Sequence, residues 1–166
     1  MQAIPYNQYG EEVLKTLSKG AFLTTKAGDK INTMTIGWGS IGFSWGKPIF
    51  MAMVRRSRYT YELIEKSGEF TVSFPREDLA QALKICGTQS GRDLDKIASC
   101  GLGLSTPPEI GTPFILCKGI HYVCKTLYKT EMTAENMDSA VYQMAYAANQ
   151  DYHTLYFGQI LAAYEI

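Results

Sequence analysis

The sequence predicts a mainly β protein with inserted helices, in which most strands run antiparallel. Segments rich in β-branched, aromatic and methionine side chains recur along its 166 residues and are separated by glycine and proline turn signals. Helical periodicity is confined to shorter stretches between them. This order of elements favours an antiparallel barrel over a doubly wound sheet.

The predicted strands fall into two groups. The residues 105–113, STPPEIGTP, form a turn-rich surface loop that separates two halves of one domain spanning 1–166. We expect strands at 21–25, 31–43, 49–54 and 70–74 before the loop, and at 114–127 and 153–164 after it.

Four helical regions are expected. The first, 11–18, places Val13, Leu14 and Leu17 on one face and ends near Gly20. A second begins after Ser57 as its N-cap and stops at Gly68. The other two are a helix from 79 to 86, interrupted by Gly87 and Gly91 and resumed at 93–100, and a helix within 133–148 that points Met137, Val141 and Met144 inward.

Composition excludes several classes of function. Lysine plus arginine and aspartate plus glutamate each total 16, so no net positive field attracts nucleic acid or an anionic membrane. The N-terminus lacks a basic and then apolar leader, which predicts a cytoplasmic protein. The four cysteines form no C-x-x-C pair and only two histidines accompany them, so we expect reduced thiols and no metal site.

The residues 37–42, GWGSIG, match the dinucleotide fingerprint G-x-G-x-x-G. That fingerprint must open a helix, yet FSWGKP follows at 43–48 and leads into a turn and a strand. Glu62, at the spacing of a ribose-binding acid, falls in a helical pattern. We therefore interpret these glycines as points where a strand bends or a flat ligand approaches the backbone.

Four segments in order resemble the flavin reductase-like, or flavoredoxin, family: NTMTIGW at 32–38, RRSRYTYELI at 55–64, CGTQSGRDLDK at 86–96 and DYHTLYFGQI at 151–160. The resemblance implies an FMN-binding split β-barrel, usually a homodimer. It also implies an FMN-dependent oxidoreductase, either an NAD(P)H-dependent flavin reductase or a flavoredoxin-type carrier of two electrons. The alternatives are a non-enzymatic FMN electron carrier between proteins and a split barrel that binds another planar ligand.

Arg55, Ser57, Arg58 and Thr60 suit the FMN phosphate, because guanidinium groups and hydroxyls there surround a predicted helix N-terminus. The alternative is that Ser57 only caps the helix and that the arginines are solvated. By resemblance, Asn32, Thr33, Met34 and Thr35 lie along the isoalloxazine ring, whose polar edge needs backbone groups and short side chains. Trp38 and Ser40 are secondary candidates; strand pairing or a core position is the alternative.

The resemblance places a loop containing Cys86, Gly87, Ser90 and Gly91 over the ring. Cys86 also completes an apolar helical face, so an inert buried thiol is the alternative. Lys96 could favour negative charge on the reduced flavin or simply be a solvated lysine.

His153 is the catalytic candidate, as a contact for nicotinamide or reduced flavin, with a structural strand position as the alternative. The sequence departs from the family pattern at Trp45-Gly46-Lys47 and at Tyr152. The stretch 128–150 also matches poorly, and its helix is a candidate lid or dimer element.

Overall fold

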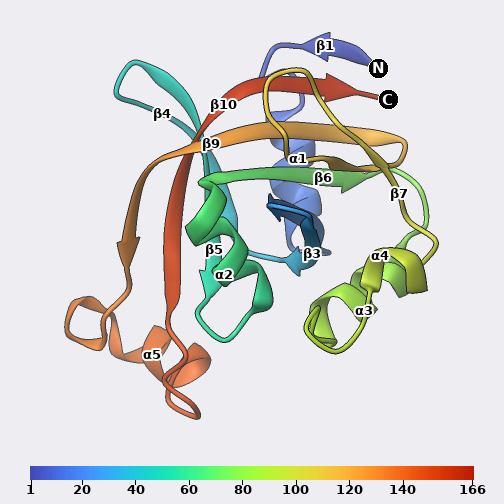
Figure 1. The fold of residues 1–166 in the computed structure, drawn as a ribbon. Helices are drawn as coiled ribbons and strands as arrows, with labels where there is room; N and C mark the ends of the chain where they lie inside the picture. The colour runs from blue at the N-terminus through green and yellow to red at the C-terminus, as the bar shows by residue number, and fades with distance from the viewer.

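The computed structural model describes all 166 residues and is built around one eight-stranded sheet with the order β3-β2-β6-β9-β10-β5-β4, to which β1 adds beside β10 (Figure 1). Every pairing in it is antiparallel. The strands are β1 (Gln2–Ile4), β2 (Ala21–Ala27), β3 (Lys30–Ile36), β4 (Gly39–Ser44), β5 (Lys47–Arg55), β6 (Glu69–Pro75), β9 (Gly119–Glu131) and β10 (His153–Glu165). The predicted mainly β, antiparallel fold is confirmed.

A small second sheet and four of the five helices pack against this sheet. β7 (Gly103–Ser105) pairs with β8 (Phe114–Leu116). The helices are α1 (Gly10–Leu17), α2 (Tyr59–Ser67), α3 (Ala80–Thr88), α4 (Lys96–Ser99) and α5 (Ser139–Ala145), with a 3₁₀ turn η1 (Ala134–Asn136) before α5. The exception is α5, which lies beyond the lower end of β10 (Figure 1). None of the helices combines the length and apolar character needed to traverse a lipid bilayer.

The sheet curls without closing, since β3 and β4 form its two edges. β9 and β10 are its longest strands, and their register shifts between Phe157 and Gly158 and again between Ile160 and Ala162. A Cβ at position 158 would lie 2.5 Å from the ring of Phe70. Glycine there leaves room for the Phe70 ring, at the first register shift between β9 and β10.

Two apolar clusters lie on opposite faces of β2. The main core fills the barrel and includes the fully buried Phe50, Phe70 and Tyr122. A smaller cluster joins Phe22 to Cys86 of α3 and to Ile115 of β8. β2 is thus buried on both faces, and α3 is fixed against the barrel beside β3.

Two of the predicted strands prove to be pairs of strands. The segment 31–43 divides at Gly37-Trp38, where the chain leaves the β3 edge and starts β4 at the opposite edge. A Cβ on Gly39 would lie 2.8 Å from the Met51 carbonyl oxygen, so the glycine allows close pairing with β5. The segment 114–127 divides at Cys117-Lys118 before Gly119, which has a φ of 152°.

The helices lie where they were predicted, but not every predicted cap is correct. Gly68 ends α2 in the left-handed conformation with a φ of 66°, as predicted. The N-cap is Arg58 and not Ser57, because the Ser57 side chain is bound elsewhere. Gly87 does not interrupt α3, which continues to Thr88. α1 is confirmed, although Leu14 is 50% exposed while Val13 and Leu17 are buried.

The prediction for 133–148 is wrong in its burial. The stretch contains the short η1 and the short α5, and Val141 and Met144 are exposed. The residue that turns inward is Tyr146, directly after α5, with 1% of its surface exposed. Its hydroxyl finds hydrogen-bond partners in the interior, which a methionine could not use.

Candidate functional site

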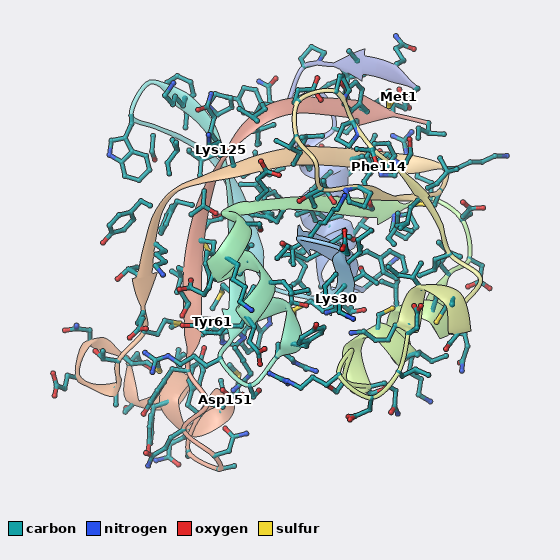
Figure 2. All side chains as sticks on the ribbon, viewed as in Figure 1. Met1, Lys30, Tyr61, Phe114, Lys125 and Asp151 are labelled. Carbon is teal, nitrogen blue, oxygen red and sulfur yellow. The ribbon has the colours of Figure 1, made fainter.

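Three adjoining cavities lie along β3 and the N-terminus of α2, two of them facing the α3–α4 loop and one facing β5 and the start of β10. The inner cavity, about 190 Å³, is lined by Met34, Thr35, Ile36, Gly37, Trp38, Met53, Arg55, Arg58 and His153. The helix cavity, about 150 Å³, is lined by Asn32, Met34, Ser57–Thr60, Thr88–Arg92 and Lys96. The outer cavity, about 450 Å³, extends it along Lys30–Asn32, Tyr59 and 91–97. Figure 2 labels Lys30, which lines the outer cavity, and Asp151, which lines none of the three cavities but contacts Ser57 of the helix cavity.

Shared walls make these hollows one site. Met34 and Arg58 line both the inner and the helix cavity. Asn32, Gly91 and Lys96 line both the helix and the outer cavity. The structure therefore brings together most of the predicted cofactor residues, from three separate stretches of sequence, and a fourth stretch adds His153.

Lys96 is a buried cation without a carboxylate partner. Its residue surface is 4% exposed, and its Nζ donates one hydrogen bond, 3.3 Å long, to the Cys86 carbonyl. Burial lowers the pKa of Lys96, and the nearby charge of Arg58 lowers it further. An ammonium group desolvated in this way and facing two cavities is poorly satisfied by the protein alone, which favours an anionic or electron-rich ligand.

Arg58 adds a second unpaired cation at the N-terminus of α2. Its Nη1 donates to the Gly87 carbonyl at 2.8 Å, and it forms no ion pair. Arg58 is the N-cap of α2, and Tyr59 and Thr60 begin the helix. These residues line the helix cavity, so the free N–H groups and the positive end of the α2 dipole lie beside it.

A tight contact fixes the floor of the helix cavity. Asn32 Nδ2 donates a 2.7 Å hydrogen bond to Thr60 Oγ1, which joins β3 to α2. A Cβ at Gly91 would lie 2.0 Å from Asn32 Oδ1. Only glycine fits at position 91, and the backbone of the 90–92 turn is thereby exposed to the cavity. Ser90 lines the same cavity, and its Oγ accepts from the backbone N–H of Arg92.

β3 contributes main-chain groups without a strand partner to the site, as well as side chains. It is a terminal strand of the sheet, so its outer main-chain groups lack a strand partner. Met34 and Thr35 line the inner cavity, and Thr35 Oγ1 donates to the Leu83 carbonyl at 2.6 Å. Thr33 lines none of the three cavities: its hydroxyl donates to the Leu23 carbonyl at 3.3 Å and accepts from Thr24 at 3.0 Å. Only the backbone of Thr33 can contribute to binding.

His153 lies at the far end of the inner cavity and is 8% exposed. Its Nδ1 is 2.6 Å from the Tyr146 hydroxyl, and its ring packs 5.4 Å from that of Trp38. Burial lowers its pKa to about 4, assisted by the charges of Arg55 and Arg58. The imidazole is therefore neutral at physiological pH and offers a hydrogen bond and a flat face, not a positive charge.

The segment after β9 closes on this end of the site. Arg55 donates to the carbonyl oxygens of Asp151 at 2.5 Å and Ala145 at 3.1 Å, and its guanidinium lies 5.1 Å from the ring centre of Tyr146. The Asp151 carboxylate accepts from the Ser57 hydroxyl at 2.5 Å and from the Ser57 N–H at 3.3 Å. The Asp151 carboxylate thus occupies one of the donors that the sequence suggested for phosphate, Ser57.

Cys86 and Gly87 lie behind the cavities. The Cys86 side chain is fully buried in the α3 cluster, and burial raises the pKa of its thiol to about 12. Gly87 presents its carbonyl to Arg58, and a Cβ there would lie 3.4 Å from the Thr35 Cβ. Neither residue lines any of the three cavities, and Gly87 instead holds the Arg58 side chain through its carbonyl.

Sequence reasoning missed Arg92, Asp151 and Tyr146. Arg92 lines two cavities, pairs with Glu62 and lies 5.4 Å from the ring centre of Tyr59. Arg92 and Asp151 stand inside segments that carry the family resemblance, so that signal could have found them. Tyr146 had no such signal, because it lies in the stretch that departs from the family pattern.

The sequence profile of the flavin reductase like domain matches residues 16–166, which include every strand of the main sheet except β1 and all the cavity residues. The chain belongs to this family. Among its relatives, an uncharacterized protein of Archaeoglobus fulgidus is 26% identical over 140 residues, covering 84% of this chain and 68% of its own length. The uncharacterized protein YddH of Escherichia coli is 28% identical over 133 residues, covering 80% of this chain and 61% of YddH. The chain thus spans about two thirds of the length of these relatives or less.

Solved structures of the flavin reductase like fold superpose well. A flavoredoxin from Methanosarcina acetivorans aligns with a TM-score of 0.70 at 24% identity, over 89% of this chain and 68% of the other. An FMN-binding protein from Thermus thermophilus aligns with a TM-score of 0.69 at 20% identity, over 88% of this chain and 69% of the other. A 2-nitrobenzoate 2-nitroreductase from Pseudomonas fluorescens aligns with a TM-score of 0.69 at 17% identity, over 99% of this chain and 77% of the other. At these identities the likeness establishes the fold, and the split barrel expected from the sequence is confirmed.

Proposed function

We propose that residues 1–166 form one FMN-binding domain that carries out two-electron redox chemistry as an NAD(P)H-dependent flavin reductase or a flavoredoxin-type protein. The observation that carries the proposal is the pair of unpaired cations, Arg58 and the buried Lys96, facing joined cavities beside a helix N-terminus. Family membership and the shared fold of the FMN-binding protein from Thermus thermophilus support FMN as the occupant.

The residues present fit a phosphorylated flat ring. We assign the phosphate to the helix cavity, with Arg58, Ser90 and the first N–H groups of α2 as its donors. Ser57 and Thr60 line the same cavity. The Ser57 hydroxyl already donates to Asp151, whereas the Thr60 hydroxyl accepts from Asn32 and keeps its own proton to donate. Ser57 can donate to the phosphate only if its hydrogen bonds to the Asp151 carboxylate break.

The ring is assigned to the β3 edge, along Asn32–Thr35, with Lys96 on one side and the inner cavity on the other. Main-chain groups of an edge strand can pair with the polar rim of a flat heterocycle at short range. The Lys96 ammonium would stabilise negative charge gained on reduction. When bound, FMN supplies a ring that accepts a hydride and passes its electrons on.

His153 and Trp38 then form an aromatic wall of the inner cavity, beside the proposed ring site. His153 is held neutral, so we assign it to stacking and hydrogen bonding with the reaction partner and not to proton donation. This role suits the nicotinamide of NADH or NADPH, because hydride transfer needs orientation and no protein nucleophile. We also propose a homodimer, for which the exposed Val141 and Met144 on α5 are candidate contacts.

The first test is binding of FMN, followed by absorption and flavin fluorescence, in the wild type and in Lys96→Met. We expect the variant to bind FMN at least about 10-fold more weakly, since a hydrogen bond to a buried charge contributes roughly 1.5–3 kcal/mol. The control is Lys84→Met, an exposed lysine on neighbouring α3. A wild type that ignores FMN would refute the proposal.

A second measurement separates an enzyme from a carrier. NADH or NADPH that bleaches the bound flavin, with steady turnover when free FMN is added, would establish a reductase. A flavin that stays oxidised with both nucleotides but is reduced by a protein donor would establish the electron carrier instead.

A further inference from the structure

The Tyr146 hydroxyl is a buried polar group that contacts two side chains. Its oxygen lies 2.6 Å from His153 Nδ1 and 3.4 Å from the Met132 sulfur, and only 1% of the Tyr146 surface is exposed. The Tyr146 ring is held between the Arg55 guanidinium, 5.1 Å from its centre, and the Tyr152 ring, 5.2 Å away. The hydroxyl is thus confined to these two hydrogen-bond partners.

The single proton of this hydroxyl determines which ring nitrogen of His153 is protonated. A thioether sulfur accepts hydrogen bonds and has no proton to donate, whereas an imidazole nitrogen can do either. Because the Tyr146 hydroxyl donates to the Met132 sulfur, the proton in the 2.6 Å contact comes from His153 Nδ1. Burial lowers the pKa of His153 to about 4, so the neutral ring has no second proton and Nε2 carries a lone pair.

The Nε2 atom of His153 is free to bind a ligand. His153 lines the inner cavity, and Tyr146, which contacts the other ring nitrogen, does not. Nε2 makes no hydrogen bond within the chain. The buried side-chain polar atoms that lack a partner are the hydroxyls of Thr126 and Thr154, so Nε2 is not sealed inside the protein. Its lone pair is therefore available on the residue that faces the inner cavity.

The other polar side chains of the inner-cavity wall are mainly hydrogen-bond donors. Arg55 and Arg58 can only donate, as can the Trp38 indole. An unprotonated His153 Nε2 therefore adds an acceptor to a wall of donors. A primary amide suits this combination, because its oxygen accepts hydrogen bonds while its N–H groups donate them.

We propose that Tyr146 is a positioning residue that, with Met132, keeps the His153 proton on Nδ1 and thereby makes Nε2 the acceptor for an amide N–H of the reaction partner. The amide rests on the proposed function, since the nicotinamide of NADH or NADPH carries a primary carboxamide. With the opposite tautomer, Nε2–H would face that N–H as a second donor and would select a partner with an acceptor oxygen instead.

The tautomer is measured without flavin, by nitrogen NMR of the imidazole rings in the intact protein at neutral pH. The wild type should carry the His153 proton on Nδ1. His121 is an internal reference for the opposite tautomer, because its Nε2 lies 3.0 Å from the Cys117 carbonyl, which can only accept. These are the two histidines of the chain, and His121→Gln assigns the signals. A His153 proton on Nε2 in the wild type would overturn the proposal.

Met132→Leu tests how the proton is directed. Leucine accepts no hydrogen bond, so the Tyr146 hydroxyl should turn to His153 and the ring proton should move to Nε2. Met137→Leu is the matched control, a half-buried methionine of the same stretch whose sulfur makes no hydrogen bond, and it should keep the proton on Nδ1. Tyr146→Phe should leave both tautomers populated. A tautomer that changes in neither Met132→Leu nor Tyr146→Phe would overturn the role of Tyr146.

The amide is tested on the FMN-loaded protein with NADH and with its reduced 3-acetylpyridine analogue, in which a methyl group replaces the amide nitrogen. In the wild type the KM of the analogue should be roughly 2- to 10-fold higher, the effect of one lost hydrogen bond. In Met132→Leu the ratio of the two KM values should fall toward one, and in Met137→Leu it should stay at the wild-type value.

Equal KM values in the wild type, or no reduction by NADH, would overturn the amide as the recognised group. A wild type that binds no FMN would refute the proposed function, whereas the NMR measurement needs no flavin and still decides the tautomer. The wild-type spectrum is decisive even if a variant fails to fold.

Discussion

The Tyr146 hydroxyl lies 2.6 Å from Nδ1 of His153, at the point where the segment after β9 meets the candidate site. Both side chains are buried, and the Tyr146 hydroxyl also donates to the Met132 sulfur at 3.4 Å. A stretch that departs from the family pattern thus determines how the one histidine of the site is held. The pair is the most direct link between that stretch and the proposed chemistry.

Tyr146→Phe should destabilise the fold by about 1 kcal/mol, because a buried hydrogen bond is lost and His153 Nδ1 is left unpaired. Denaturant unfolding measures the loss. Tyr142→Phe on α5 is the matched control, since its hydroxyl forms no hydrogen bond within the chain. Equal stability of the two variants would show that the contact does not hold the histidine.

Acid should destabilise the protein through its two buried histidines. Burial lowers the pKa of His121 and of His153 to about 4, below the ordinary value of 6.5. Between pH 6.5 and 4 the unfolded chain therefore binds more protons than the folded chain. The stability that the two neutral, buried histidines contribute is complete above pH 6.5 and is lost as the pH falls toward 4. The full loss is on the order of 3 kcal/mol per histidine.

His121→Gln tests this pH dependence. Glutamine can keep the contacts that His121 makes with the Ser73 hydroxyl and the Cys117 carbonyl, both 3.0 Å long, but it does not titrate. The difference in unfolding free energy between pH 7 and pH 4.5 should be smaller in the variant than in the wild type. An unchanged difference would mean that His121 is protonated in the fold as readily as in the unfolded chain.

Asp151→Asn should strengthen FMN binding several-fold, because it removes a negative charge from the Ser57 donors and frees them for phosphate. Titration with riboflavin, which lacks the phosphate, should show no such gain. Asp29→Asn, in the exposed turn between β2 and β3, controls for net charge. A weaker affinity for FMN in Asp151→Asn would indicate that Asp151 holds the site in its binding form.

Gly91→Ala should abolish FMN binding while lowering stability by roughly 1–3 kcal/mol, the usual effect of overpacking. The added methyl would force Asn32 away from Thr60 and change the floor of the helix cavity. Gly111→Ala is the control, since a Cβ there meets no atom within 4 Å. Fluorescence titration and thermal unfolding of both variants check the prediction, and normal FMN affinity in Gly91→Ala would contradict it.

Local patterns predicted elements well where one physical cause acted alone. Gly68 ends α2 as expected, because the left-handed conformation favours glycine whatever surrounds it. Where two interactions competed for one side chain, the prediction was wrong. Serine is a common N-cap residue, but the Ser57 hydroxyl donates to Asp151, 94 residues later in the sequence, and does not cap α2. Similarly, the apolar character of Val141 and Met144 suggested burial, and the fold left both exposed.

The sequence alone determined the alternation of strands and turns, the positions of α1 and α2, and the stretches in which cations and small residues would gather. These depend on the propensities and spacing of neighbours in the chain. Only the tertiary structure decided that Lys96 is buried and without a carboxylate, that Gly91 abuts Asn32, and that Tyr146 reaches His153. Burial and pairing of a polar group depend on what distant strands and helices place around it, and no local pattern carries that information.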